Sequence, residues 1–249
     1  MNIKTDQATI NTNDAIPYTK EIDLTFPPLS CQLDSSNLTC LVGPHRSQLR
    51  AYLQMLAGIS IPEQGMVNIL GQQVSELDQL GWKKFRCKVG YLSGTAPLLS
   101  VQHGLMNVML PVLYHTDLSF RETAAKARAI MAEINCDFEP TTYPALLTGF
   151  QRLQLALARA LILEPEVLFL DVPFNDLGAK EREKMAKLLG RYKLNRTVCM
   201  IGGLQYPRFL EQHVKQIIYI SEHKIISFNS WELFMQTADP EIRNLLSIL

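Results

Sequence analysis

The stretch from Leu38 to Gly58 constrains the fold of this chain more than any other. Residues 38–42 read Leu-Thr-Cys-Leu-Val, an almost continuous apolar run that predicts a strand buried on both faces. A helical pattern follows over residues 49–58 and ends at a glycine. Gly43 lies between the two elements. A strand, a glycine-containing loop and a helix in this order favour an α/β fold with parallel core strands.

The loop between these two elements has the position of a phosphate-binding loop but not its chemistry. Such a loop requires G-x-x-x-x-G-K-[ST], in which backbone amides surround phosphate, the lysine contacts it and the hydroxyl binds Mg²⁺. Gly43 matches this pattern, whereas Gln48, Leu49 and Arg50 stand at the second glycine, the lysine and the hydroxyl residue. Gly43, Ser47 and Arg50 remain as vestigial nucleotide-binding candidates at the start of a helix, where anions are generally attracted.

Three ordered blocks in the second half indicate what kind of scaffold this is. Residues 147–151 read Leu-Thr-Gly-Phe-Gln, residues 156–161 read Ala-Leu-Ala-Arg-Ala-Leu, and residues 167–174 read Val-Leu-Phe-Leu-Asp-Val-Pro-Phe. Together they resemble the ATP-binding cassette (ABC) ATPase family. Its signature motif, Leu-Ser-Gly-Gly-Gln, precedes an Ala-Arg-Ala-Leu helix and a Walker B strand that ends in Asp-Glu-Pro. The resemblance covers the chain from about Leu24 onward.

The resemblance implies a fold class and a domain organisation. The family has an α/β, P-loop NTPase-like ABC ATPase fold with a mixed or parallel core sheet, an antiparallel β subdomain and a helical subdomain. We expect an ABC ATPase-like domain over residues 21–249, with its helical subdomain at about residues 95–146. We expect residues 1–20 to form a flexible N-terminal tail.

The signature segment is partly retained. In the family this segment caps the γ-phosphate that the opposite subunit binds, and Thr148, Gly149 and Gln151 lie at matching positions. Thr148 keeps a hydroxyl, and Gly149 keeps an amide at a helix N-terminus. Phe150 replaces the second glycine, and we expect its ring to pack at a subunit interface.

The positions that would carry hydrolysis are changed. Asp171 closes the Walker B strand, but Val172 stands where the family has a glutamate that activates water, and loss of a general base typically lowers a rate by about 10²–10⁴-fold. Ser93 or Gly94 occupies the place of a glutamine that touches Mg²⁺, and Gly203 occupies that of a switch histidine. We therefore expect no catalytic residue, no metal site and no cofactor, and only weak binding of any ATP and Mg²⁺. The vestigial binding candidates are Gly43, Ser47, Arg50, Thr148, Gly149, Gln151 and Asp171.

Composition excludes some classes of partner. Lys plus Arg and Asp plus Glu both number 24, so no net charge favours nucleic acid. The five cysteines lack C-x-x-C spacing, which argues against a zinc site or a disulfide framework. No apolar run reaches the roughly 18 residues that a spanning helix needs, so we expect any membrane role to come through a partner.

Two shorter segments resemble one branch of the family. Leu99-Ser100-Val101, followed by Asn107-Val108 and Leu110-Pro111, is similar to the ATPases of MCE-type phospholipid transport systems of Gram-negative envelopes. Residues 239–246, Asp-Pro-Glu-Ile-Arg-Asn-Leu-Leu, are similar to the C-terminal tail of the same ATPases. The ATPases of importers and of lipoprotein-release systems share parts of this pattern.

The resulting hypothesis is a degenerate, non-hydrolysing ABC subunit that acts as a structural or regulatory partner in a membrane transport complex. It would pair with an integral-membrane permease and with a second ABC ATPase subunit, either itself or a competent paralogue. It would lie in the cytoplasm, on the inner face of the cytoplasmic membrane. We expect the permease to dock on about residues 94–120, which are rich in leucine, valine and methionine. An active or weakly active ATPase and a soluble adaptor that uses the ABC fold are the alternatives.

Overall fold

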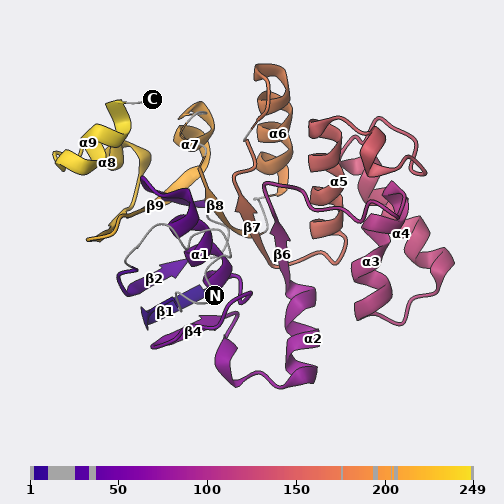
Figure 1. Ribbon diagram of the computed structural model, residues 1–249, viewed down its shortest axis with the longest axis horizontal. Coiled ribbons are helices and arrows are strands. Elements are labelled where there is room, and N and C mark those ends of the chain that lie inside the picture. The colour runs from indigo at the N-terminus through magenta and orange to yellow at the C-terminus, as the bar shows by residue number, and fades with distance from the viewer. Residues whose placement is uncertain are drawn as a thin grey trace. The chain divides into compact units, whose positions relative to one another are not determined.

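The computed structural model describes residues 3–10, 26–33, 38–174, 176–192, 196–202, 204 and 207–247. The chain divides into two compact units, which we describe separately. Unit 1 comprises Met1–Asp78 and Lys193–Leu249, and unit 2 comprises Gln79–Tyr192. Figure 1 labels the helices and strands of both units.

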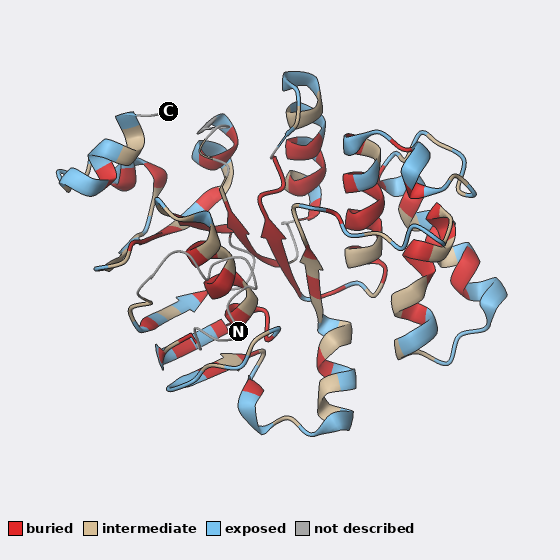
Figure 2. Ribbon diagram, in the orientation of Figure 1, coloured by how far each residue is buried: buried red, intermediate tan, exposed pale blue. Residues whose placement is uncertain are grey.

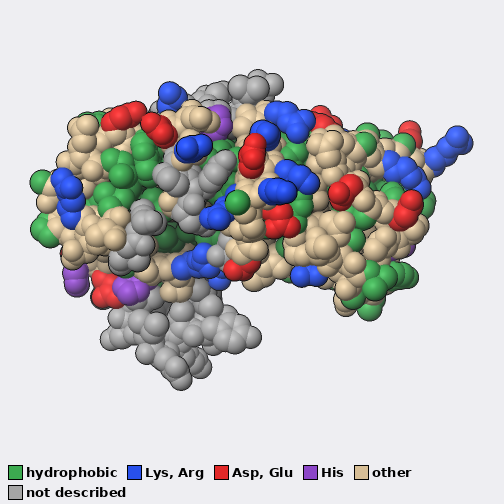
Figure 3. Space-filling view, turned by 90° about the horizontal axis from the view of Figure 1, so that it is seen from above, with side chains coloured by type: hydrophobic (Ala, Val, Ile, Leu, Met, Phe, Trp, Pro, Cys, Tyr) green, Lys and Arg blue, Asp and Glu red, His purple; other side chains and the backbone are tan. Residues whose placement is uncertain are grey.

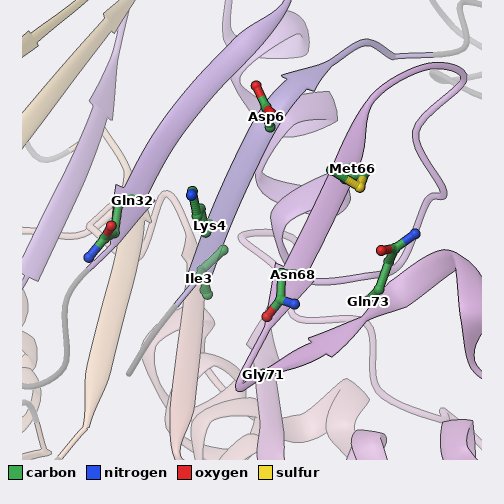
Figure 4. Close-up of a pocket in the computed structure, with 8 residues that line it drawn as sticks. All are labelled: Ile3, Lys4, Asp6, Gln32, Met66, Asn68, Gly71 and Gln73. Atoms are coloured by element: carbon green, nitrogen blue, oxygen red, sulfur yellow. The ribbon is translucent and has the colours of Figure 1, made fainter.

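Unit 1 contains an antiparallel sheet of four short strands in the order β2-β1-β4-β5. The strands are β1 (Ile3–Ala8), β2 (Leu29–Leu33), β4 (Met66–Ile69) and β5 (Gln72–Gln73), and a 3-10 turn, η1 (Val74–Glu76), follows. Ile3 and Thr5 are buried, whereas Lys4 and Asp6 are exposed, so one face of the sheet is apolar and the other polar. Lys4, Asp6 and Gln32 stand on the polar face over a pocket of about 420 Å³ (Figure 4).

The prediction of a flexible tail over residues 1–20 is therefore wrong for its first part. Residues 3–8 form a strand that pairs with β2 on one side and with β4 on the other. Ile3, Thr5 and Ala8 are buried inside unit 1, which holds the strand in place. Residues 11–20 lie outside the described residues.

Unit 1 also contains the strand that the sequence predicts most firmly. β3 (Leu38–Val42) is buried at every position and pairs in parallel with β8 (Thr197–Ile201) and with β9 (Val214–Ile220). β10 (Ile225–Phe228) pairs antiparallel with β9. The helices of this unit are α1 (Arg46–Leu56), α7 (Pro207–His213), α8 (Trp231–Met235) and α9 (Pro240–Ser247).

Unit 2 contains two parallel strands, β6 (Val89–Leu92) and β7 (Val167–Asp171). β7 is buried along its whole length, as expected for a strand covered on both faces (Figure 2). The helices are α2 (Gln79–Lys88), α3 (Gly104–His115), α4 (Phe120–Glu133), α5 (Gly149–Leu161) and α6 (Ala179–Tyr192), with the 3-10 turn η2 (Pro144–Leu146) before α5. α3 packs against both α4 and α5. The predicted α/β architecture, with parallel core strands, an antiparallel sheet and helices between residues 95 and 146, is confirmed.

Candidate functional site

The segment after β3 is helical where a phosphate-binding loop would be open. α1 begins at Arg46, with His45 before it in an extended conformation. The amide of Leu49 donates to the carbonyl of His45 over 3.1 Å, which closes the first helical turn. Residues 46–48 would have to curve around a phosphate in a working loop, and here they form that turn. The predicted helix start at Leu49 is three residues too late.

Side chains fill the space beside this turn. Leu49 is only 4% exposed, and its Cδ2 lies 3.3 Å from the point where a Cβ on Gly43 would be. That Cβ would also lie 2.0 Å from the carbonyl oxygen of Ile220, so only glycine fits at position 43. Gln48 is fully buried, and its Nε2 donates to the carbonyl of Ser221 over 3.4 Å. Gln48, at the family's second glycine position, thus bonds to the residue that follows β9, and Leu49, at the lysine position, packs beside Gly43.

The remaining candidates of this loop lie at its rim. Ser47 and Arg50 are half-buried on α1, and Gly43 precedes them, so the structure brings these three predicted residues together. His45 Nε2 lies 3.3 Å from a carboxylate oxygen of Glu222 at the same rim. The first-turn amides of α1 favour an anion, whereas the carboxylate of Glu222 opposes one.

The end of β7 is closed by apolar packing. Asp171 is almost fully buried, and Val172 after it is buried with a φ of 49°. A β-branched residue at positive φ is strained, so the surrounding packing holds it there. A Cβ on Gly94 would lie 2.5 Å from the carbonyl oxygen of Asp171 and 2.6 Å from Cγ2 of Val172. A glutamine side chain has no room at Gly94.

The retained signature residues form a capping box at the start of α5. The hydroxyl of Thr148 accepts from the amide of Gln151 over 3.2 Å, and the amide of Thr148 donates to Oε1 of Gln151 over 2.9 Å. Nε2 of Gln151 donates to Asp137 Oδ1 over 3.4 Å. Gly149 is exposed, and a Cβ on it would meet nothing nearer than 4.0 Å. Thr148 and Gln151 therefore have a complete structural role in holding the helix start.

The prediction that Phe150 packs at a subunit interface is wrong. Phe150 is 8% exposed, and its ring lies 5.8 Å from the ammonium of Lys184 on α6. The side chain turns into unit 2 because α6 covers it there.

The predicted site residues are divided between the two units. Gly43, Ser47 and Arg50 belong to unit 1, and the signature residues and Asp171 belong to unit 2. Gly203 lies outside the described residues. Within the described ranges, no group of three or more His, Cys, Asp or Glu side chains could hold a metal ion.

A groove between α2 and α3 was not predicted from the sequence. It has a volume of about 380 Å³, and we define this α2–α3 groove by its lining residues Gln79, Leu80, Trp82, Lys83, Arg86, Tyr114 and His115. Leu80 is 60% exposed and Tyr114 is 74% exposed. The guanidinium of Arg86 lies 4.9 Å from the ring of Trp82, and burial lowers the pKa of Arg86. Burial, with the nearby charges of Lys83 and Arg86, also lowers the pKa of His115.

The apolar residues predicted to form a docking surface are divided between core and surface. Leu105, Val108 and Met109 are buried in unit 2, so they cannot contact a partner. Leu99 and Val101 are exposed. This part of the set is buried because α3 packs against both α4 and α5.

The exposed loop before α3 is held by one amide side chain. Asn107 is fully buried, and its Oδ1 accepts from the amide of Leu99 over 2.7 Å. Its Nδ2 donates to the carbonyls of Leu99, Gln102 and His103 over 3.1, 2.9 and 3.2 Å. Asn107, the asparagine of the Leu-Ser-Val…Asn pattern that resembles one branch of the family, thus holds the loop to α3.

A comparison with protein families decides the classification. The family model described as ABC transporter matches residues 28–175. This chain belongs to the ABC transporter family. The match runs from β2 to β7 and includes β3, α1 and the whole α2–α3 groove, and it corresponds to the ATP-binding domain.

Curated relatives of this ABC transporter domain agree. The uncharacterized ABC transporter ATP-binding protein YbbA of Escherichia coli (strain K12) is 33% identical over 157 residues, which cover 63% of this chain and 68% of YbbA. The sulfate/thiosulfate import ATP-binding protein CysA 2 of Shewanella oneidensis is 30% identical over 168 residues, which cover 66% of this chain and 46% of that protein. The chain spans about half the length of the latter.

Solved structures confirm the predicted ABC ATPase fold. A dimeric bacterial ABC transporter cassette matches with a TM-score of 0.77 and 22% identity, covering 91% of this chain and 98% of that one. The ABC transporter subunit cbiO1 of Clostridium perfringens matches with a TM-score of 0.74 and 18% identity, covering 99% of this chain and 94% of that one. ABC ATP-binding subunits typically dimerise and pair with membrane permease components. In the described part of this domain, no helix combines the length and apolar character needed to cross a bilayer.

Proposed function

We propose that this ABC transporter domain is a non-hydrolysing subunit that gives shape or regulation to a membrane transport complex. The observation that carries the proposal is Leu49, a buried leucine that packs against Gly43 where the family places the phosphate-binding lysine. Charge-assisted hydrogen bonds are the strong contacts in a phosphate site, and Leu49 can make none. The position is part of the hydrophobic packing of unit 1.

The chemistry of unit 2 supports the same proposal. A general base must reach the proton of the attacking water, and Val172 has no group that could accept it. Gly94 has no side chain to place on a metal ion, and a longer residue would clash with the backbone of β7. A domain with these substitutions keeps the fold of the family without the groups that its reaction needs.

A phosphate-release assay on the purified protein tests the proposal. We expect no release of phosphate from ATP and Mg²⁺ above the level of a mock purification. The matched control is Asp171→Asn, which changes the one Walker B carboxylate that remains. Release that survives purification and disappears in Asp171→Asn would show an active ATPase and overturn the proposal.

We further propose that a permease docks on the α2–α3 groove through a short cytoplasmic helix. The groove combines exposed apolar groups, Leu80 and Tyr114, with the cations Lys83 and Arg86. Such a surface suits an amphipathic helix that carries acidic residues beside its apolar face. Apolar side chains left this exposed are typical of a partner surface.

Matched substitutions test the docking surface. Leu80→Asp places a charge in the groove, and Leu146→Asp places the same charge on a leucine that is 77% exposed on η2, outside it. We expect Leu80→Asp to move the protein from the membrane fraction to the soluble fraction and Leu146→Asp to leave it bound, while circular dichroism shows both folded. Equal membrane association of the two variants would exclude the groove as the docking surface.

The cargo proposed is phospholipid, from the similarity to MCE-type systems in residues 99–111 and 239–246. In that setting the domain lies on the cytoplasmic face of the membrane and pairs with itself or with a competent ATPase subunit. Affinity purification from detergent-solubilised membranes tests this, with the protein as bait. Phospholipid retained by the purified complex is expected, and a complex that transports a water-soluble solute instead would refute the assignment of cargo.

A further inference from the structure

A pocket of about 340 Å³ in unit 2 lies between α5 and α6, which stand next to each other in Figure 1. We define this α5–α6 pocket by six of its lining residues, Phe150, Gln154, Lys184, Lys187, Leu188 and Arg191. None of these residues is among the vestigial nucleotide-binding candidates. Phe150, the residue that departs most in size from the signature motif, forms part of the wall.

Gln154 is a polar residue buried in the wall of this pocket. It is only 4% exposed, and its Nε2 donates to the carbonyls of Ile134 and Asn135 over 3.3 and 2.9 Å. Two carbonyl acceptors fix the orientation of the amide, because the side-chain oxygen cannot face them. Oε1 therefore points away from these carbonyls; the atom is itself buried in the wall, and it has no hydrogen-bond partner among the described residues. A buried acceptor without a donor is unfavourable, so a ligand that brings a donor would be stabilised there.

The mouth of the α5–α6 pocket carries positive charge. Lys184, Lys187 and Arg191 follow one another at helical spacing on α6 and all line the pocket. Asp137 is the one acidic side chain in the lining, and it already accepts a hydrogen bond from Gln151. Lys187 forms an exposed ion pair with Glu183 over 2.8 Å, and exposed pairs of this kind are weak enough for a phosphate to compete with them. Figure 3 shows Lys and Arg side chains near the middle of the face seen from above, with Asp and Glu side chains among them. Lysines act as point charges for phosphate, and an arginine adds paired donors.

The inner wall is apolar and includes an aromatic face. Phe150, Leu188 and Ile134 line it, and all three are buried. The ammonium of Lys184 lies 5.8 Å from the ring of Phe150, so a cation and an aromatic face border the same space. Pockets for small molecules typically combine such apolar walls with a few fixed polar groups.

We propose that the α5–α6 pocket binds a small phosphate monoester whose organic part is flat and apolar and carries a hydroxyl or amine. The phosphate lies at Lys184, Lys187 and Arg191, because a monoester carries about −1.5 to −2 charges near pH 7. The flat part lies against Phe150 and Leu188. The hydroxyl or amine donates to Oε1 of Gln154, which removes the unpaired acceptor. The bound ligand bridges the signature helix α5 to α6.

Isothermal titration calorimetry with 4-hydroxyphenyl phosphate tests this proposal on the full chain. This probe carries the phosphate, the flat ring and the donor together. Inorganic phosphate lacks the ring, and 4-hydroxybenzoate lacks the phosphate. We expect saturable binding of the probe and at least about tenfold weaker binding of each comparison compound, since each lacks one set of contacts.

Two variants on the same helix provide the control. Lys184→Gln removes a cation from the pocket, and Lys180→Gln removes one from the same helix outside the lining residues. We expect about tenfold weaker binding for Lys184→Gln and unchanged binding for Lys180→Gln. Both side chains are exposed, so neither change should unfold the domain. Absence of saturable binding at millimolar probe, or equal weakening by the two variants, would overturn the proposal.

Discussion

Restoring the family's lysine by the single substitution Leu49→Lys should destabilise the domain without creating an ATP site. Leu49 is 4% exposed, so replacing it can remove nearly all of the stabilisation from burying its side chain, about 1.5–3 kcal/mol. An uncompensated buried charge is unfavourable by about 3–5 kcal/mol. The lysine stem can still cover part of the same apolar surface. If the stem recovers most of the burial, the buried charge remains, so we expect a net loss of about 3–5 kcal/mol, a large fraction of a typical total stability of about 5–15 kcal/mol.

Urea unfolding, followed by circular dichroism with and without ATP and Mg²⁺, measures both parts of this prediction. A ligand present at about 100 times its Kd would raise the free energy of unfolding by about 2.7 kcal/mol. We expect no such increase in Leu49→Lys, since Gln48 stays buried and residues 46–48 stay in a helical turn.

Leu49→Met is the matched control, because it preserves volume and apolar character. It should lower the free energy of unfolding by less than about 1.5 kcal/mol. The reasoning would be refuted if Leu49→Lys unfolded at the same urea concentration as the wild type. An ATP-dependent gain of about 2.7 kcal/mol in that variant would refute it equally.

Three further predictions follow from contacts in the two units. Gly94→Ala should lower the free energy of unfolding by about 1–3 kcal/mol, because the added methyl group overpacks the end of β7. Gly149→Ala should change the free energy of unfolding by less than about 0.5 kcal/mol, because the added group has open space. Equal urea midpoints for the two variants would contradict the close contact at Gly94. Thr148→Val removes the capping hydroxyl and should lower the free energy of unfolding by about 1 kcal/mol, whereas Thr148→Ser keeps the hydroxyl and should keep the stability. Thermal melts of the two variants measure this difference. The Lys224 ammonium lies 2.6 Å from Asp239 and lowers the pKa of its carboxyl group in the folded protein. The pair therefore stabilises the fold fully above the unfolded pKa of about 3.9. This stabilisation is lost as the pH falls through the lower pKa of Asp239 in the folded state. Asp239→Asn should thus melt below the wild type at pH 7 and approach it in acid, and a difference that does not change with pH would contradict this role.

The core strands were predictable because their sequence signal is local. β3, β6 and β8 begin and end where the predicted runs Leu38–Val42, Val89–Leu92 and Thr197–Ile201 do. β3 and β8 are buried at every position, and a strand buried on both faces needs mostly apolar residues. β1 was missed because Ile3–Ala8 alternates and is mostly polar, so its pairing with β2 and β4 depends on contacts with distant residues. The alternation of Ile3 and Thr5 was the only signal available.

The candidate site was predictable in its position but not in its packing. The pattern located Gly43 and the changed residues after it, yet it could not show that Leu49 fills the space beside Gly43. Phe150 was placed at an interface because nothing in the sequence shows that α6 covers it. The α2–α3 groove depends on which side of α2 faces α3, and exposure of Leu80 and Tyr114 follows only from the packed structure.

The four hydrogen bonds of Asn107 give the loop over residues 99–103 a mechanical property. The loop cannot move without α3, because a single buried amide ties both ends of the loop to the first turn of that helix. Leu99 and Val101 on this loop are exposed, so a partner could contact them. We expect a partner that displaces these residues to move α3, which packs directly on α5. We therefore expect a displacement at this loop to reach α5, the helix that Thr148 caps, without any bound nucleotide.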